Sequence, residues 1–228
     1  MNKIFVIANS QGTTSGVTEG ESYPYLLQRI LPDYHYHFFI LSGGSIREFE
    51  THIGNILLVN PDLVIFQIGI MECARRILSE TEKKVLKKLP LGWMITKKLH
   101  DHRKWTIQWR NRFNINSRKM TPGVFRDGIR SLSEKLNRYH IQYLFLEIPY
   151  FSPQYEREYY PLINEDIHVY NQIIGEFNSA PIVYPEDDLY SIWQQGTVHF
   201  NKAGHQLVAE RIKKIILEVH SKEAIHKQ

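Results

Sequence analysis

The stretch Lys3-Ile-Phe-Val-Ile-Ala-Asn-Ser-Gln-Gly12 decides the fold, because an apolar run of strand length passes directly into small polar residues. The pattern predicts a buried strand over residues 3–8, followed by a tight loop that carries Ser10. Later runs of the same kind end at glycine, proline or a polar residue. They predict four further strands, over residues 34–41, 63–68, 141–148 and 180–184.

Stretches of helical spacing alternate with these strands. They cover residues 23–31, 46–59, 121–139, 166–177 and 201–219. Such alternation indicates βαβ units and a parallel sheet with right-handed crossovers. We therefore expect an α/β fold, a three-layer sandwich around a mostly parallel five-stranded sheet of flavodoxin-like type. The chain length favours a single domain over residues 1–228, with a helical insertion at about 72–118.

Composition narrows the class of protein further. The one cysteine, Cys73, excludes an internal disulfide framework. The first residues lack the pattern of a secretory signal peptide, and no apolar run is long enough to span a membrane. We expect a cytoplasmic protein, with the inner face of the membrane as the alternative location. We expect no cofactor.

Ser10 and His199 are the candidate reactive pair. A serine hydroxyl needs a neighbouring base to become a nucleophile, and neutral histidine is the usual one. Ser10 follows the first strand and His199 precedes the last helix, so both are predicted at the carboxyl edge of the sheet. The backbone N–H groups of Ser10 and of Gly43 or Gly44 are candidate oxyanion donors. Taken singly, such a serine or histidine is more often structural.

Four blocks together resemble the SGNH (GDSL-like) hydrolase superfamily. They are Ala8-Asn9-Ser10, Gly43-Gly44, Gly69-Ile70-Met71-Glu72 and Gly196-Thr197-Val198-His199, the last continuing as Phe200-Asn201-Lys202-Ala203-Gly204-His205. In that family a serine follows the first strand and a glycine the second. A Gly-x-Asn-Asp block follows the third, and Asp-x-x-His precedes the last helix. The resemblance implies nucleophilic Ser10, with Asn9 beside it as possible support.

Two positions depart from the family pattern. Met71 stands at the position of the oxyanion asparagine, and Gly196 stands at the position of the aspartate that orients the histidine. A Ser-His dyad then needs a backbone carbonyl or another carboxylate to fix the imidazole. Asp187 and Asp188 are near in sequence, and nothing in the sequence favours either.

Residues 69–76 also resemble a variant block, Gly-x-x-Asp-Cys-x-x-Arg, of relatives in polysaccharide biosynthesis. Glu72 would replace that aspartate and pair with Arg76 one helical turn on, in support of the site. A surface ion pair between Glu72 and Arg76 is the equally weighted alternative.

The segment 83–119 holds twelve Lys/Arg and one acid, Asp101, with three tryptophans and Phe113 among them. We favour amphipathic helices whose tryptophans, Trp93, Trp105 and Trp109, pack on the sheet. A lid that contacts an anionic substrate or a membrane surface is the alternative. Nucleic acid is not expected.

Two smaller features are also ambiguous. The aromatic cluster Tyr150, Phe151, Tyr155, Tyr159 and Tyr160 suits either sugar stacking or cover of an apolar edge. The pairs His35/His37 and His100/His102 could ligate a metal, but the first pair lies on a predicted strand with no acidic or cysteine cluster beside it, and we predict no metal.

These features favour an SGNH-type serine esterase or acyl hydrolase, with an O-acylated carbohydrate from a polysaccharide or glycolipid as the substrate class. The partner would then be a small-molecule or glycan ester. Acyl transfer to a glycan would use the same residues. A third alternative is an SGNH fold with little or no catalysis that binds glycan or lipid.

Overall fold

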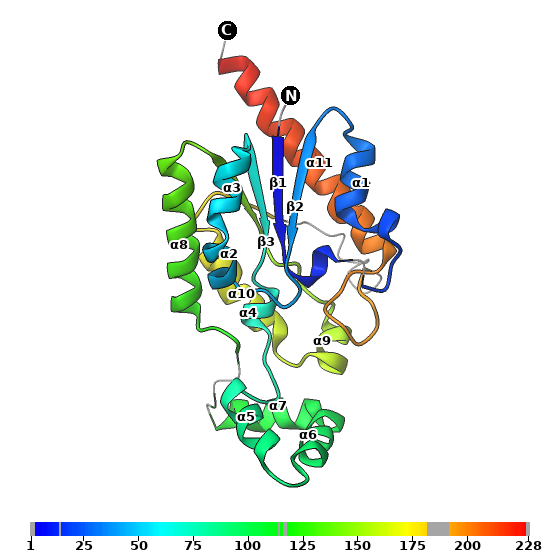
Figure 1. The fold of residues 1–228 in the computed structure, drawn as a ribbon. Helices are drawn as coiled ribbons and strands as arrows, with labels where there is room; N and C mark the ends of the chain where they lie inside the picture. The colour runs from blue at the N-terminus through cyan, green and yellow to red at the C-terminus, as the bar shows by residue number, and fades with distance from the viewer. Residues whose placement is uncertain (1–2, 14, 114, 116–117, 182–191, 227–228) are drawn as a thin grey trace.

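The protein is described by a computed structural model covering residues 3–13, 15–113, 115, 118–181 and 192–226. Within these residues, five strands form one sheet in the order β2-β1-β3-β4-β5, and every neighbouring pair is parallel (Figure 1). The strands are β1 (Lys3–Ala8), β2 (His35–Ile40), β3 (Leu63–Gln67), β4 (Gln142–Leu146) and β5 (Ser179–Ala180). This confirms the predicted parallel five-stranded sheet. Residues 182–184 of the predicted fifth strand lie outside the described residues.

Helices cover both faces of the sheet, as the three-layer prediction requires (Figure 1). On one face lie α1 (Tyr23–Ile30) and α11 (Lys202–His226). The other face carries α2 (Ile46–Thr51), α3 (Ile53–Val59), α8 (Pro122–Arg138) and α10 (Ile163–Ile174). The prediction of one helix over 46–59 is wrong. His52 leaves helical geometry, with φ −98° and ψ 8°, and separates α2 from α3.

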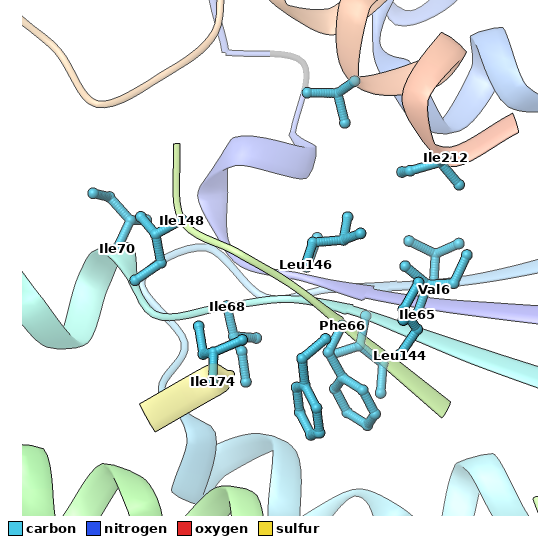
Figure 2. Packing of buried hydrophobic residues seen from close by; sticks show 14 of the residues in the cluster. Val6, Ile65, Phe66, Ile68, Ile70, Leu144, Leu146, Ile148, Ile174 and Ile212 are labelled. Atoms are coloured by element: carbon cyan, nitrogen blue, oxygen red, sulfur yellow. The ribbon is translucent and has the colours of Figure 1, made fainter. Parts of the chain in front are cut away.

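The core fills the space between sheet and helices on both sides (Figure 2). Val6, Ile65 and Leu144 come from three adjacent strands, and all are buried. The rings of Phe66 and Phe145 stack across β3 and β4 with centroids 4.7 Å apart. Strands buried on both faces read as continuous apolar runs, which is why they are visible in the sequence.

The insertion leaves the body at Arg75 and returns at Arg118, where the two residues form an antiparallel bridge. It contains α5 (Glu80–Lys88), α6 (Gly92–Asp101) and α7 (Arg103–Arg112), which we call the helical appendage. Preceding it, α4 (Ile70–Cys73) contacts α10 and belongs to the body. Figure 1 shows the appendage beyond the carboxyl ends of the strands, near α9 (Pro153–Tyr159).

The tryptophans of the appendage do not pack on the sheet, so the favoured sequence interpretation is wrong on this point. Trp93, Trp105 and Trp109 are 69%, 62% and 44% exposed. The helical spacing was sound, but it defines which residues share a face and not what that face contacts. Among the described helices, none combines the length and apolar character that a membrane span requires.

Candidate active site

Ser10 lies in a tight turn directly after β1. Asn9 begins a 3₁₀ turn over Ser10–Gly12, and its Oδ1 accepts the Gln11 N–H at 3.0 Å. Gly12 closes the turn on the strand, since a Cβ at this position would lie 2.7 Å from that of Ala8. Ser10 is therefore held at the carboxyl edge of the sheet by an asparagine cap and a glycine.

His199 lies beside Ser10, although 189 positions separate them in sequence. Its Nδ1 is 3.2 Å from the Ser10 carbonyl oxygen. A carbonyl oxygen can only accept a hydrogen bond, so this contact requires the proton on Nδ1, and in the neutral imidazole Nε2 is then the acceptor. The Ser10 carbonyl thus orients the imidazole, as one of the two alternatives for a missing aspartate. Asp187 and Asp188 lie outside the described residues.

Ser10 Oγ makes no hydrogen bond to His199 or to any other residue that the structure describes. In many enzymes the bond between nucleophile and base is long before substrate binds. The arrangement therefore shows an oriented imidazole beside a serine whose hydroxyl remains available.

Buried amides connect the serine turn to its neighbours. Gln67 Nε2 donates to Gln11 Oε1, and Gln11 Nε2 donates to the Val198 carbonyl, both at 3.2 Å. Both hydrogen bonds lie in a region where Gln11 and Gln67 are each 2% exposed. They fix the turn, the end of β3 and the His199 loop relative to one another. Sequence reasoning missed them, although a glutamine at the end of an otherwise apolar strand was the signal.

The glycine pair after β2 divides into two roles. The Gly44 N–H donates to the Leu41 carbonyl at 2.9 Å, which closes a turn. Among the described residues, the N–H groups of Gly43 and Ser10 have no acceptor. Gly43 adopts φ 70°, a conformation that favours glycine. Gly43 is thus the candidate oxyanion donor, and the N–H of Gly44 is already used.

The Glu72 carboxylate links the loop after β2 to the loop after β3. Its Oε1 accepts the Ile46 N–H at 2.7 Å, and its Oε2 accepts the Gly69 N–H at 3.1 Å. Burial raises the pKa of this carboxyl to about 7, while these backbone donors and Lys119 act in the opposite direction. The residue is fully buried, so the alternative of a surface ion pair is wrong.

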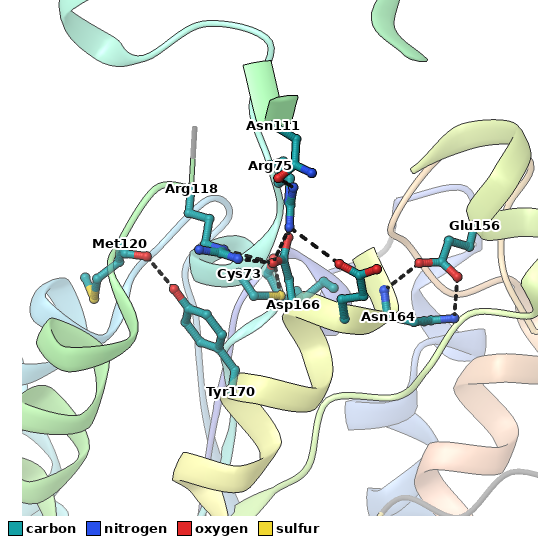
Figure 3. Close-up of polar contacts among 11 residues, drawn as sticks. Cys73, Arg75, Asn111, Arg118, Met120, Glu156, Asn164, Asp166 and Tyr170 are labelled. Atoms are coloured by element: carbon teal, nitrogen blue, oxygen red, sulfur yellow. Dashed lines mark hydrogen bonds and ion pairs between the residues drawn. The ribbon is translucent and has the colours of Figure 1, made fainter. Parts of the chain in front are cut away.

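The predicted pairing of Glu72 with Arg76 along one helix is also wrong, because α4 ends at Cys73. The arginine beside it, Arg75, makes the buried ion pair instead (Figure 3). Arg75 Nε lies 2.6 Å from Asp166 Oδ2, and Arg118 Nε lies 2.9 Å from Asp166 Oδ1. Asp166 has no exposed surface. Two arginines at the base of the appendage are thus fixed to α10.

Lys119 brings a positive charge to the glycine loop, and sequence reasoning missed it within the general basic segment. Its Nζ contacts the Gly43 carbonyl oxygen and lies 3.6 Å from Glu48. Met71, at the position of the family asparagine, is half-buried against the core and offers no N–H donor from its side chain.

Tyrosines from α9 and its following turn hold the His199 loop. The Tyr155 hydroxyl accepts the Thr197 N–H at 3.0 Å, and the Tyr160 hydroxyl donates to the Gly196 carbonyl at 3.2 Å. Tyr155 and Tyr160 are buried, which favours cover of the edge over sugar stacking for these two. Gly196 has φ 72°, so the glycine at the aspartate position suits its backbone.

Groups of three or more His, Cys, Asp or Glu side chains placed to hold a metal ion do not occur within the described part of the chain. His35 and His37 instead stack edge to face on β2, with ring centroids 4.9 Å apart.

Comparison with known proteins gives structural neighbours only. No family model and no curated protein matches the chain. Solved structures match over nearly its whole length. An acetyl xylan esterase, AlAXEase, aligns with TM-score 0.60 and 15% identity, covering 94% of this chain and 99% of that one.

Two further solved structures align with this chain over a similar length. Esterase EstA from Pseudoalteromonas sp., in a structure inhibited by monoethylphosphonate, has TM-score 0.59 and 13% identity, with 97% and 100% coverage. A member of the lipolytic protein G-D-S-L family from Veillonella parvula has TM-score 0.59 and 11% identity, with 94% and 98% coverage. The chain therefore has the fold of the GDSL (SGNH) hydrolases, as its motifs predict.

Proposed function

We propose that the protein is a serine ester hydrolase of SGNH type, with Ser10 as nucleophile and His199 as general base. The observation that carries the proposal is the contact between His199 Nδ1 and the Ser10 carbonyl oxygen, at 3.2 Å. It brings a histidine beside a serine at the carboxyl edge of a parallel sheet, and it leaves Nε2 free to accept a proton. The fold, shared with esterases, supports the same reaction class.

The reaction follows from these groups. Ser10 Oγ attacks the ester carbonyl carbon while its proton passes to His199 Nε2, and the carbonyl π electrons move to oxygen. The intermediate collapses, the bond to the leaving alcohol breaks, and His199 returns the proton to that alcohol. Water then attacks the acyl-serine, His199 takes its proton, and the acid leaves as Ser10 regains a hydrogen.

The N–H groups of Ser10 and Gly43 would receive the oxyanion. A third donor is absent at Met71, and one oxyanion donor is commonly worth a factor of about 10² to 10³ in rate. We therefore expect slower turnover than in a site with a full set of donors.

The proposed substrate is an O-acylated carbohydrate in a polysaccharide or glycolipid context. One neighbour is named an acetyl xylan esterase, and residues 69–76 resemble a block from polysaccharide-biosynthesis relatives. A cytoplasmic setting is part of the proposal, because the one cysteine of the sequence gives no sign of an oxidising compartment. Transfer of the acyl group to a glycan hydroxyl, in place of water, would use the same residues. Incubation of an acylated sugar with an added acceptor sugar separates hydrolysis from transfer, because only transfer yields an acylated acceptor.

A binding module without efficient catalysis is the second candidate. It is favoured by Met71, by Gly196 and by the absence of a hydrogen bond on Ser10 Oγ among the described residues. In that case the same edge would bind an acylated glycan or a lipid and release it unchanged.

Labelling with a fluorophosphonate probe, mapped by peptide mass spectrometry, tests the proposal. We expect one adduct on Ser10, lost in Ser10→Ala and slowed by about 10²-fold or more in His199→Ala. Ser42→Ala removes an exposed serine of the neighbouring loop, and His168→Ala removes an exposed histidine; both should label as the wild type does.

Folded wild-type protein that takes up no probe would reject the hydrolase and favour the binding module. An adduct on another serine would reject the assignment of Ser10. Circular dichroism on each variant separates these outcomes from a failure to fold.

A further inference from the structure

The helical appendage exposes an unusual amount of apolar surface. Trp93, Leu91 and Trp105 are each more than 60% exposed. The other large apolar side chains in residues 80–115 that are at least 37% exposed are Val85, Leu89, Met94, Ile95, Trp109, Phe113 and Ile115. Exposed apolar surface gathered in one place, as here, marks an interaction site.

Part of this surface is hollowed into a groove between α5, α6 and α7. The cavity measures about 550 Å³, and its wall is almost entirely apolar. Leu78, Leu86, Ile95 and Leu99 line it together with Trp105 and Trp109. The charged pair in its wall, Arg110 and Glu82, is neutralised internally by a contact of 2.8 Å.

The three helices that form the groove also carry a concentration of positive charge. Seven exposed cations of the appendage form no ion pair with a described acidic side chain. They are Lys84, Lys87, Lys88, Lys97, Lys98, Lys104 and Arg112. Asp101 is the one acid in residues 83–119. A partner must therefore be apolar and anionic at once, a combination that an anionic bilayer surface offers.

The charge also argues against a second copy of this chain as the partner. Two appendages face to face would bring two sets of unpaired cations together, which like-charge repulsion disfavours. Indole rings among lysines are instead typical of segments that lie at the boundary of headgroups and acyl chains.

The position of the appendage relates it to the candidate active site. It lies beyond the carboxyl ends of the strands, on the side of α9 (Figure 1). At its near end, the Arg103 guanidinium lies over the Tyr160 ring, 4.2 Å from the centroid. Tyr160 in turn donates to Gly196 in the His199 loop. A surface bound by the appendage would lie at the same end of the molecule as Ser10.

We propose that the helical appendage docks on the surface of an anionic lipid bilayer, with its apolar groove toward the acyl chains and its lysines at the headgroups. Docking holds the Ser10 edge near substrates at the membrane. The proposal is independent of catalysis, so Ser10→Ala should bind membranes as the wild type does.

Vesicle flotation tests the docking directly. With vesicles of phosphatidylcholine and phosphatidylglycerol, we expect the protein to float with the lipid. With vesicles of phosphatidylcholine alone, the amount of protein that floats should be lower by a factor of about ten or more, because the lysines then lack anionic headgroups. Raising the salt to about 0.5 M should release most of the protein, since exposed charges are screened.

Two variants separate the apolar and cationic parts of the surface. Trp93→Ala/Trp105→Ala and Lys84→Gln/Lys87→Gln/Lys97→Gln/Lys98→Gln should each lower binding about tenfold or more. Arg138→Gln/Tyr139→Ala is the control, because it removes an exposed cation and an exposed aromatic ring at the end of α8 farthest from the appendage. Fluorophosphonate labelling in the absence of lipid should be unchanged in all three.

Several results would overturn the proposal. These are equal binding to both kinds of vesicle, or binding that the appendage variants leave unchanged. A dimer that light scattering detects and Trp93→Ala/Trp105→Ala abolishes would assign the surface to a second copy. Tighter binding to an RNA or DNA oligonucleotide than to anionic vesicles would assign it to nucleic acid.

Discussion

The carboxyl edge of the sheet and the helical appendage lie at the same end of the molecule, but their aromatic residues differ in exposure. At the edge, Trp193 is 4% exposed and stacks on Phe151 with ring centroids 4.2 Å apart. In the appendage, Trp93 is 69% exposed. The edge uses its rings to fix a loop, whereas the appendage presents its rings to solvent.

The two regions also treat charge differently. Asp166, beneath the base of the appendage, neutralises Arg75 and Arg118 inside the protein. Farther out, Lys97 and Lys98 have no acidic partner among the described side chains. The comparison teaches that paired charge and buried rings mark the part that must hold a geometry. Unpaired charge and exposed rings mark the part for which we propose a membrane partner.

Trp193→Ala is the largest expected change in stability. We expect the free energy of unfolding to fall by about 3–5 kcal/mol, because truncation of a buried indole leaves a cavity beside Phe151 and Phe200. Urea unfolding followed by circular dichroism measures it. A loss below about 1 kcal/mol would show that the His199 loop does not depend on this packing.

Asp166→Asn should lower the free energy of unfolding by about 3 kcal/mol, because it leaves two partly buried arginines without their counter-charge. The same urea experiment applies. Glu176→Gln is the matched control, since it breaks the exposed pair with Arg126 and should cause no measurable change. Equal effects of the two substitutions would contradict a structural role for the buried pair.

Glu72→Gln tests the pH dependence at the loops it joins. Folding raises the pKa of Glu72 from 4.5 to about 7, so the unfolded chain releases this proton first as the pH rises. The stability that the protonated carboxyl contributes is complete below pH 4.5 and is lost as the pH reaches about 7. The loss is on the order of 1–3 kcal/mol.

The difference in unfolding free energy between wild type and Glu72→Gln, measured from pH 4.5 to 8, isolates this group. We expect the difference to move in favour of the variant as the pH rises. A difference that is constant across this range would mean that burial does not raise the pKa of Glu72.

Trp93→Ala is the smallest expected change. The side chain is mostly exposed, so we expect the free energy of unfolding to change by no more than about 0.5 kcal/mol. The same urea titration as for Trp193→Ala gives a direct comparison of the two tryptophans. A loss as large as that of Trp193→Ala would show that Trp93 belongs to the packed structure of the appendage.

Much of the fold could be predicted, because the buried strands are continuous apolar runs that end in small residues. Residues 3–8 and Ser10 are the clearest case. The parallel direction of the strands follows from the alternation of strands and helices. The spacing of the last block also placed His199 at the edge that carries Ser10. Local composition and chain order carried this information.

The remaining features depend on contacts between distant residues. Helical spacing could not show that Trp105 faces solvent, because it defines a face without its partner. Nothing near Glu72 in sequence indicated that it accepts the Ile46 N–H. The backbone turn uses the Gly44 N–H and leaves that of Gly43 available. Two adjacent glycines allow many backbone conformations, so the sequence could not show which N–H the turn would use.

The central claim is that Ser10, His199 and Gly43 act on one ester group, and a crystal structure of the phosphonate adduct tests it most directly. The account predicts phosphorus bonded to Ser10 Oγ, with the phosphoryl oxygen about 3 Å from the N–H groups of Ser10 and Gly43. His199 Nε2 should face the alkoxy oxygen on phosphorus, which takes the position of the leaving-alcohol oxygen of an ester. Phosphorus on another side chain, or a phosphoryl oxygen directed away from Gly43, would contradict it.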